Sequence, residues 1–504
     1  MTRPTLPLVV PLDPVPDPLE AAERFRDLPF LLLLDSTADR ERTGRYSFLS
    51  ADPYRVLRSR AAGSAARASG WGMPAVSDAL AAARAELARF AAPPVDGIPP
   101  FQGGAAGYIG YDWGATLERL PRCRYDDLEL PDAMLGLYDW VVAWDHLERA
   151  AWIVSTGIPC ERRTRLRRAE ERLEMVRARL DRPAEVRVDG RAEIVPHPAL
   201  RPSASAAPSY PVIGVEDAEA IGLRSTFTHR GYLSAVARVR EYIVAGDIFQ
   251  ANLSQRFQAP LAEPPLALYR RLRRTNPAAF GAYLDFGEVQ ILSVSPERFL
   301  RVSGRQVETR PIKGTRPRGL GPMHDALLGR ALAESAKDRA ENVMIVDLLR
   351  NDLSRVCRPG TVRVPELFAL EQHPTVYHLV STVVGELEPW ADRVDLLRAT
   401  FPGGSITGAP KVRAMEIIAE LEPTQRGVYC GSLGYLSLNG EMDTSIAIRT
   451  CVVRGDEVYF QAGGGIVADS DPEAEYRETL DKARGIIRAL AGRLSPQPAA
   501  QGER

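Results

Sequence analysis

Hydrophobic positions in the first 60 residues fall into short, dense runs separated by polar turns. The stretches "FLLLLDS" (30–36), "GRYSFLS" (44–50) and "YRVLRS" (54–59) predict β-strands, because such runs bounded by turn residues are typical of buried strands. An alanine-rich segment at about 77–92 predicts a helix. The glycines among aromatic residues in "FQGGAAGYIGYD" (101–112) are typical of close-packed strands or of a bulge.

The next segments change in both charge and periodicity. Residues 160–181 have apolar residues at helical spacing amid dense charge, which predicts an exposed amphipathic helix. Acidic residues interleave with the arginines, so this helix is not a nucleic-acid-binding stripe. From about 182 to 225 the chain is rich in Pro, Ser and Ala without periodicity, which predicts a linker. We therefore expect an N-terminal domain over 1–205 that ends in this linker, a second domain over 206–495, and a disordered tail over 496–504.

Beyond the linker, helical and strand-like patterns follow one another. A helical stripe begins after Thr228, a favourable N-cap residue, and stops at Gly246, where a helix can end. Residues 290–300 and 305–313 predict strands. Two β-rich runs flank Asn439-Gly440, a strong hairpin signal.

The last helix is the most clearly marked. Ser470 and Glu473 fit a capping box, Pro472 lies in the first turn, and helix-forming residues continue to about residue 492. Along the whole chain, strands and helices mix without a regular βαβ order, and no GxGxxG or GxxxxGK[ST] loop occurs. This pattern favours an α+β fold over a Rossmann or P-loop architecture.

Composition narrows the classes of function. The 504 residues are 45% apolar and 26% charged, as in an ordinary globular protein. With 64 basic and 65 acidic residues the net charge is −1, so no global field favours nucleic acid or an anionic membrane as a partner. The five cysteines are scattered, which is simplest to explain as reduced thiols in a cytoplasmic protein. The N-terminal segment has no signal-like apolar region, and the apolar run near it is too short to span a bilayer.

Carboxylates on the terminal helix have two interpretations. Glu475, Glu478 and Lys482 share one helical face. They form either a solvated face with an i,i+4 Glu–Lys pair or part of a ligand site.

A second helix, predicted over 336–357, is apolar nearly all round its middle, which predicts burial. Glu341 lies on it, with Asp338 one turn earlier. A buried carboxylate needs a cation, a proton or a donor. Arg339 or Arg350 could supply a salt bridge, and a hard cation such as Mg²⁺, which prefers oxygen ligands, is the alternative.

Glycine-rich segments and isolated cations are the remaining unusual features. "FPGGSITGAP" (401–410) and "QAGGGIVADSDPE" (461–473) each precede a predicted helix, where bare backbone N–H groups can bind an anion, although a tight turn is the simpler explanation. Arg449 is a candidate carboxylate clamp. Lys313, in "RPIKGTRPRG" (310–319), is either a solvated lysine or a nucleophile held among arginines.

These segments, in this order, resemble the chorismate-utilising enzymes, a family that includes the anthranilate, aminodeoxychorismate, isochorismate and salicylate synthases. The matching segments cover about residues 225–490 and read "GDIFQANLSQRF", "SPERFL", "RPIKGTRPRG", "ENVMIVDLLRNDLSRV", "HLVSTVVGEL", "FPGGSITGAPKVRAMEII", "GVYCGSLGYLS" and "GGGIVADSDPEAEYRETLDKA". The stretches "LLLLDS…GRYSFLS" and "GGAAGYIGYD" extend the resemblance into the N-terminal part. It implies an α+β fold in which large antiparallel sheets and surrounding helices form a central cleft.

Two positions indicate a branch of this family. The anthranilate branch characteristically has P-I-A-G-T where this chain has P-I-K-G-T with Lys313, as in the aminodeoxychorismate branch. The isochorismate and salicylate branches have a water-activating lysine where this chain has Gln250. Both positions imply amination of chorismate to 4-amino-4-deoxychorismate, on the route to p-aminobenzoate and folate.

The resemblance also implies roles for individual residues. The catalytic residues are Glu297 as general acid/base for the C4 hydroxyl, Lys313 as nucleophile at C2, and His378 beside the reacting ring. Magnesium is held directly by Glu341 and Glu478, and through water by Asp338 and Glu475. The substrate is held by Ser405, Tyr429, Arg449, Gly465 and Lys482, with Gln250 at the position that separates the branches.

This chemistry places demands on two side chains. Glu297 must be protonated to act as an acid, which requires a raised pKa. Lys313 must be neutral to attack, yet at a pKa of about 10.4 only about one amine in a thousand is neutral near neutral pH, a handicap of roughly 4 kcal/mol. We expect burial together with Arg310, Arg316 and Arg318 to lower the pKa of this lysine.

Ammonia is expected to come from a separate glutaminase subunit. The chain has no G-x-C-x-G nucleophile elbow, and the nearest segment is "VYCGSLG" around Cys430. The alternatives are an anthranilate synthase component, a specialised-metabolism relative, or a non-catalytic protein that binds chorismate or tryptophan. The N-terminal segment resembles the part that holds tryptophan in relatives, with a candidate pocket formed by Ser36, Arg45, Tyr46 and Ser47.

Overall fold

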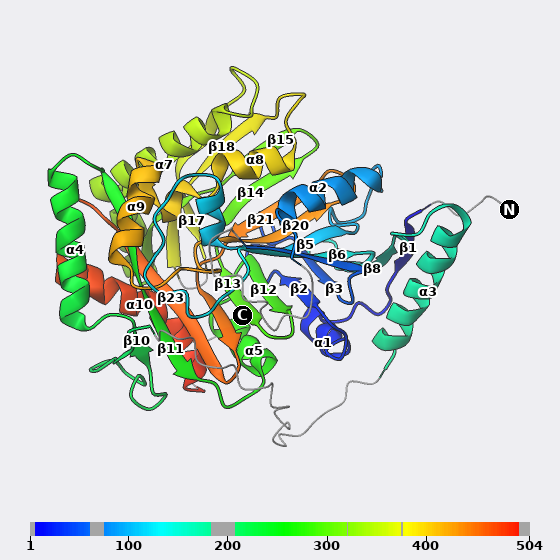
Figure 1. The fold of residues 1–504 in the computed structure, drawn as a ribbon, viewed down its shortest axis with the longest axis horizontal. Helices are drawn as coiled ribbons and strands as arrows, with labels where there is room; N and C mark the ends of the chain where they lie inside the picture. Colours follow the sequence, from blue (N-terminus) through cyan, green and yellow to red (C-terminus); the bar gives the residue numbers. More distant parts are fainter. Residues whose placement is uncertain (1–5, 61–74, 183–206, 320, 374–375, 493–504) are drawn as a thin grey trace.

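A computed structural model describes residues 6–60, 75–182, 207–319, 321–373 and 376–492. The predicted tail and most of the predicted linker lie outside these residues. Two large antiparallel sheets occupy the centre of the molecule and helices cover them (Figure 1). This arrangement confirms the predicted α+β class with large antiparallel sheets.

The first sheet joins strands from both ends of the chain. In spatial order it contains β1 (Leu8–Pro11), β8 (Ala150–Ser155), β7 (Trp140–Asp145), β3 (Tyr46–Ser50), β2 (Leu31–Asp35), β12 (Phe280–Asp285), β13 (Gln290–Ser295), β22 (Thr450–Arg454), β23 (Glu457–Ile466), β11 (Gln250–Pro260), β10 (Arg224–Ser225) and β9 (Tyr210–Pro211), with β19 (Gly408–Ala409) paired to β11.

The second sheet is assembled in the same way. Its order is β16 (Ile312–Pro317), β18 (Val376–Glu386), β15 (Gln306–Thr309), β14 (Arg298–Ser303), β21 (Met442–Ile446), β20 (Ser432–Ser437), β5 (Gly104–Ile109), β6 (Ala133–Tyr138) and β4 (Arg55–Ser59), with β17 (Arg363–Gln372) paired to β18. In both sheets a block of strands from before the predicted linker pairs edge to edge with a block from after it. The proposed boundary at residue 205 therefore stays a prediction about the sequence and does not separate the sheets.

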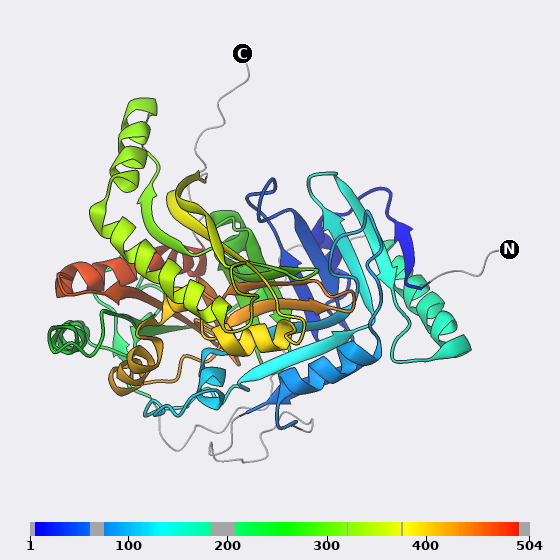
Figure 2. The same cartoon turned by 90° about the horizontal axis from the view of Figure 1, so that it is seen from above.

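Helices cover the outer faces and ends of the two sheets. They are α1 (Pro18–Glu23), α2 (Ala79–Arg89), α3 (Arg162–Leu180), α4 (His229–Val244), α5 (Pro265–Thr275), α6 (Pro322–Ala333), α7 (Ala336–Ser354), α8 (Arg393–Thr400), α9 (Lys411–Leu421) and α10 (Pro472–Leu490), with 3₁₀ turns η1 (Tyr111–Thr116) and η2 (Gly404–Ile406). Helices α4, α9 and α10 lie at one end of the molecule and α3 at the other (Figures 1 and 2). Among the described helices, none is both long enough and apolar enough to cross a membrane.

The side-chain pattern of β2 shows why the sheets stack. Successive strand residues point to opposite faces. Leu31 and Leu33 pack into a core beneath α1, α3, α5 and α10, whereas Leu32 packs into a second core between the two sheets. The continuous "LLLL" run therefore belongs to a strand that is buried on both faces. A third core, which includes Ile345 and Leu396, lies between the second sheet and helices α2, α7, α8 and α9.

Several local predictions are confirmed. The side chain of Thr228 caps α4, and Gly246 follows that helix with φ +84°. Strands β20 and β21 form the hairpin predicted at Asn439-Gly440. Helix α3 occupies the segment predicted as an exposed amphipathic helix.

Other local predictions are wrong. Asp471, not Ser470, caps α10: its side chain accepts the Ala474 backbone N–H at 2.8 Å. The Ser470 hydroxyl instead accepts the Val467 N–H and donates to Glu475 Oε1. The end of the predicted linker contains the short strands β9 and β10, which extend the first sheet. Helix α7 is buried on one face only, and Val343 on its other face is 46% exposed.

The glycines of "QAGGGIV" lie in strand β23 rather than in a turn. Gly463 faces β11 so closely that a Cβ atom would lie 2.4 Å from the carbonyl oxygen of Leu253. The triplet is therefore explained by the close approach of two backbones, and neither a turn nor an anion loop is needed at these residues.

This contact predicts a stability effect. Gly463→Ala is expected to lower the free energy of unfolding by about 1–3 kcal/mol, because the new methyl group must displace backbone. Gly329→Ala, in helix α6, is the matched control. The new Cβ would lie no closer than 3.4 Å to any side chain, so the substitution should leave the free energy of unfolding unchanged or raise it by up to about 1 kcal/mol. Chemical denaturation measures both, and equal effects would contradict the close-approach explanation.

Candidate active site

The predicted site residues gather where the two sheets end beside α7 and α10. Strands β16 and β18 carry Lys313 and His378, and Glu297 lies in the short connection between β13 and β14. The other sheet contributes Gln250 at the start of β11 and Gly465 near the end of β23. Ser405 lies in the 3₁₀ turn η2. The folding of both sheets is therefore needed to bring these side chains together.

A chain of hydrogen bonds links three of the predicted residues. The Ser405 hydroxyl donates to Glu297 Oε1 at 2.7 Å, and the Lys313 ammonium donates to the carbonyl oxygen of Ser405 at 3.0 Å. Glu297 is only 4% exposed. Gly314, next to Lys313, has φ +86°, and a Cβ there would lie 2.9 Å from Leu332. The P-I-K-G-T segment thus needs glycine to turn its strand at the lysine.

Burial dominates the acid–base properties of this group. It raises the pKa of Glu297 to about 7, although the Ser405 hydrogen bond and the Lys313 charge oppose the rise. Burial also lowers the pKa of Lys313, and Lys482 lowers it further, whereas Glu341 and Glu297 act in the opposite direction. An acid that is partly protonated near neutral pH therefore lies beside an amine that loses its proton more readily than a solvated lysine.

The expectation that three arginines lower the pKa of Lys313 is wrong. Arg310 binds Glu366 and Glu371, Arg316 donates to Asp338 at 2.9 Å, and Arg318 binds Asp325 and the His373 carbonyl. Their charges are balanced by acids, and none of them is among the main influences on the pKa of Lys313.

His378 and Arg449 lie close to each other on one side of the site. The Nδ1 atom of His378 is 2.9 Å from the Thr315 hydroxyl. Burial and the nearby Arg449 lower the pKa of His378 to about 3, so its imidazole is neutral at physiological pH. In the described part of the chain, the guanidinium of Arg449 forms no hydrogen bond or ion pair, and burial lowers its pKa. A half-buried, uncompensated cation is suited to an anionic ligand.

Two further predicted residues also lie in buried surroundings. Tyr429 is 6% exposed and stacks near the guanidinium of Arg426, 5.7 Å from the ring centroid. Gln250 is 1% exposed, and its Oε1 has no hydrogen-bond partner among the described residues. Its Nε2 lies where a Cβ at Gly465 would be, at 2.0 Å. Gly465 therefore makes room for Gln250.

Glu341 on α7 has no arginine partner. Arg350 pairs with Asp347, and Arg339 lies over the Phe368 ring, so neither forms the predicted salt bridge. No hydrogen bond or ion pair of the Glu341 carboxylate occurs within the described ranges. Burial raises its pKa, against the attraction of Lys313 and Lys337.

The two carboxylates of α10 differ in burial, whereas a solvated face would leave both of them exposed. Glu475 is 6% exposed, and burial raises its pKa. Glu478 forms the predicted i,i+4 pair with Lys482 at 2.7 Å, and both side chains are about half exposed at 50% and 46%. Burial favours a raised pKa for Glu478, but Lys482 outweighs it and lowers the pKa. Lys482 also donates to the carbonyl oxygen of Gly463 at 2.8 Å.

The four predicted metal ligands are not gathered into a preformed metal site. Across the described ranges, no group of three or more His, Cys, Asp or Glu side chains has metal-binding geometry. Asp338 is paired with Arg316 and Glu478 with Lys482. The donors are nevertheless all oxygens. Burial raises the pKa of Glu341, and the negative charges of Asp338 and Glu478 add to this rise. This donor chemistry fits a hard cation such as Mg²⁺.

Sequence reasoning missed Lys337. Its charge acts on Glu341, Glu475 and Glu478, which come from two different helices. The signal was present in the sequence, because Lys337 precedes Glu341 by four residues and therefore shares its helical face.

Cys430 is not an activated nucleophile. It is 1% exposed with φ +61°, and burial raises the pKa of its thiol to about 12. A thiol in this state is a poor nucleophile at neutral pH.

Three of the four residues of the candidate tryptophan pocket line one cavity. A space of 210 Å³ is bordered by Ser36, Arg45 and Tyr46, together with Phe48 and Tyr435. Ser47 does not line it. Its hydroxyl oxygen instead accepts the Ser36 backbone N–H at 2.9 Å and lies 2.7 Å from His146 Nε2. The assignment of tryptophan to this cavity stays a prediction.

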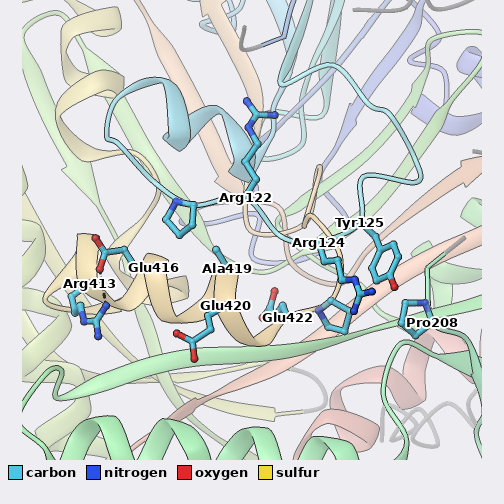
Figure 3. Close-up of a pocket in the computed structure, with 11 residues that line it drawn as sticks. Arg122, Arg124, Tyr125, Pro208, Arg413, Glu416, Ala419, Glu420 and Glu422 are labelled. Carbon is cyan, nitrogen blue, oxygen red and sulfur yellow. Dashed lines mark hydrogen bonds and ion pairs between the residues drawn. The ribbon is translucent and has the colours of Figure 1, made fainter. Parts of the chain in front are cut away.

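A larger surface groove of 700 Å³ lies along α9. Figure 3 shows Arg413 and Glu416 of this helix on one side, and Arg122, Arg124 and Tyr125 on the other. None of the predicted site residues lines it. At the start of α9, the Lys411 ammonium donates to Asp352 Oδ2 at 2.6 Å and to the Thr400 carbonyl.

Comparison with known proteins gives one consistent result. Residues 32–488 match the family described as chorismate binding enzyme. Aminodeoxychorismate synthase component 1 of Salmonella typhimurium (strain LT2) is 40% identical over 495 residues, which are 97% of this chain and 100% of that protein. Anthranilate synthase component 1 of Streptomyces coelicolor is 44% identical over 421 residues, or 83% and 78% of the two chains. The crystal structure of anthranilate synthase component I from Streptococcus pneumoniae TIGR4 superimposes with a TM-score of 0.73 at 31% identity, covering 88% of this chain and 92% of that one.

The unpaired state of Arg449 predicts a stability difference. Arg449→Met should leave the free energy of unfolding within about 0.5 kcal/mol of wild type, because the substitution removes a poorly solvated charge and breaks no internal pair. Arg298→Met is the control: Arg298 is 5% exposed and pairs with Asp443 and Glu308, so its loss should cost about 3–5 kcal/mol. A comparable loss in both variants, measured by denaturant unfolding, would mean that Arg449 has a structural partner.

Proposed function

The chain belongs to the family of chorismate binding enzymes, and we propose that it aminates chorismate at C4 to give 4-amino-4-deoxychorismate, on the route to p-aminobenzoate and folate. The observation that carries this proposal is the hydrogen-bonded chain from Glu297 through Ser405 to Lys313. It provides an acid and an amine side by side. The relatives named aminodeoxychorismate synthase component 1 support the same product.

Glu297 acts as the general acid in the first step. With a pKa of about 7 its carboxyl group is about half protonated at neutral pH. The neutral amine of Lys313 forms a bond to C2 of chorismate, both double bonds of the ring diene shift, and the C4 hydroxyl leaves as water with the proton of Glu297. Lys313 then carries a positive charge and Glu297 a negative one.

Ammonia completes the reaction in a second step. It bonds to C4, both double bonds return to their original positions, and Lys313 leaves C2 as a neutral amine. The Glu297 carboxylate takes one proton from the new ammonium group, which restores both residues. The pyruvyl enol ether is retained, and the balance is chorismate plus ammonia to aminodeoxychorismate plus water.

Cationic side chains are suited to hold the two carboxylates of chorismate. Arg449 has no anion of its own within the described residues, and Lys482 is tied only by Glu478 and a backbone carbonyl. His378 is neutral and stays a hydrogen-bonding group beside the ring. We assign substrate contacts to these three residues and to Tyr429, Gly465 and Gln250.

Magnesium is the proposed cofactor, with Glu341 and Glu478 as direct ligands and Glu475 and Asp338 in outer positions. When bound, a hard cation at the ring carboxylate would withdraw electron density from the diene. The unpartnered carboxylate of Glu341 supports this assignment. Lys482 pairs with Glu478 Oε1 at 2.7 Å, so a cation held by Glu478 would compete with this lysine for the carboxylate.

Ammonia is proposed to come from a separate glutaminase subunit. The relatives are named as component 1 of their synthases, which implies a second component. The buried thiol of Cys430, whose pKa is about 12, agrees with the lack of a glutaminase nucleophile in this segment.

A second candidate function is favoured by the relatives named anthranilate synthase component 1. Such an enzyme would also aminate the ring but would then release pyruvate. The presence of Lys313 favours the first candidate over this one.

Product identification tests the proposed function. The chain, chorismate, Mg²⁺ and an ammonium salt should give 4-amino-4-deoxychorismate, identified by mass spectrometry, and EDTA should abolish its formation. Anthranilate and pyruvate as main products would overturn the first candidate in favour of the second. No turnover with either ammonium or a glutaminase would favour a non-catalytic chorismate-binding protein.

Variants of the acid and the amine test the mechanism. Glu297→Gln and Lys313→Ala should each lower kcat by about 100-fold or more, because a positioned acid or nucleophile is lost. In the wild type, kcat should fall as the pH rises above about 7, because Glu297 loses the proton that it donates. In Glu297→Gln this fall should disappear, because only deprotonation of Lys313 then remains and it raises activity with pH. Unchanged turnover in either variant would show that the residue has no chemical role.

A further inference from the structure

A buried ion pair behind the site connects three of its segments. Arg426 and Glu422 are 3% and 4% exposed and lie in the loop that follows α9. Arg426 Nε and Nη2 donate to the Glu422 carboxylate at 2.9 and 2.7 Å. Glu422 also accepts the backbone N–H of Ser254 at 2.8 Å, which ties the pair to β11. Figure 3 shows Glu422 just past the end of α9, beside the surface groove.

The remaining donors of Arg426 reach backbone carbonyls next to predicted site residues. Nη1 donates to Ile406 at 3.1 Å, one residue after Ser405. Nη2 donates to Asn252 at 2.6 Å, two residues after Gln250. The guanidinium also stacks over the rings of Tyr111 and Tyr429, at 4.6 and 5.7 Å from their centroids. A planar fork of five donors can make these contacts together, and a lysine cannot.

We propose that Arg426, held by Glu422, is a positioning residue for the reaction: it fixes the η2 turn so that Ser405 keeps its hydrogen bonds to Glu297 and Lys313. This proposal rests on the function proposed above. Ser405 is the only link between acid and amine in the described hydrogen-bonded chain, and its own turn is a short 3₁₀ segment without a side-chain cap. Two contacts from outside hold this turn: Arg426 binds the Ile406 carbonyl, and the Thr407 carbonyl accepts the backbone N–H of Asn252, whose own carbonyl also binds Arg426.

The Ser405 hydrogen bond is one of the influences that lower the pKa of Glu297, so displacement of the turn should raise that pKa. This gives a readout that a purely structural role would not move. The pKa of Glu297 can be followed by infrared spectroscopy. The carboxyl band of this residue is the pH-dependent band that is absent from the spectrum of Glu297→Gln.

The experiment uses the full chain with Arg426→Lys, Ser405→Ala and the double variant. Ser405→Ala and Arg426→Lys should each raise the pKa of Glu297 by about one pH unit and lower kcat at least tenfold. The kcat of the double variant should lie within about twofold of that of Ser405→Ala, because both changes remove the same contact. Arg256→Lys is the matched control: Arg256 is also 3% exposed and pairs with Asp127, but it lies toward the far end of β11. It should leave both readouts unchanged.

Several outcomes would overturn the proposal. An unchanged pKa of Glu297 in folded Arg426→Lys, or independent, multiplying losses of kcat in the double variant, would exclude action through Ser405. If Arg426→Lys does not fold, Glu422→Gln, which keeps size and one acceptor, takes its place. Failure of both to fold would assign the pair to stability alone. The pKa of Glu297 measured by infrared spectroscopy does not depend on turnover. If the wild type makes anthranilate, the proposed product is refuted, but this test of Arg426 still applies.

Discussion

A buried ionisable group is costly unless it is paired with an opposite charge, is neutral, or binds a charged ligand. This electrostatic constraint accounts for the arrangement of the whole candidate site. Glu297 meets it by a raised pKa and a serine donor, and Lys313 by a lowered pKa and a backbone acceptor. His378 meets it by staying neutral. Arg449 and Glu341 are left without internal partners in the described chain, and they are the groups for which an external anion and an external cation are the natural complements.

Features with strong local signals could be predicted from the sequence. The N-cap at Thr228 and the Asn439-Gly440 hairpin depend on residues within a few positions of each other, and both are present. The mixed order of strands and helices favoured the α+β class. The large antiparallel sheets and the candidate site residues came from the resemblance to a family, because the strand order that joins β2 to β12 and β5 to β20 has no local signature.

Features that depend on distant partners could not be predicted. Arg310 and Arg318 flank Lys313 in the sequence, but their charges are neutralised by Glu366, Glu371 and Asp325 from other elements. The sequence around Gly463 predicted a turn. Glycine is needed there because the Leu253 carbonyl of another strand approaches closely, and that contact has no signal in the local sequence. The Arg426–Glu422 pair escaped notice because an i,i+4 pair in a sequence does not reveal that it is buried.

The pairing of early strands with late ones also affects how the chain folds during its synthesis. Strand β2, near the N-terminus, pairs with β12 at residues 280–285, and β5 pairs with β20 at residues 432–437. During synthesis these early strands emerge with one edge unpaired, and that edge stays open until hundreds of residues have followed. The N-terminal half therefore cannot complete its own core ahead of the rest, and native packing of both sheets has to wait for the C-terminal strands to leave the ribosome.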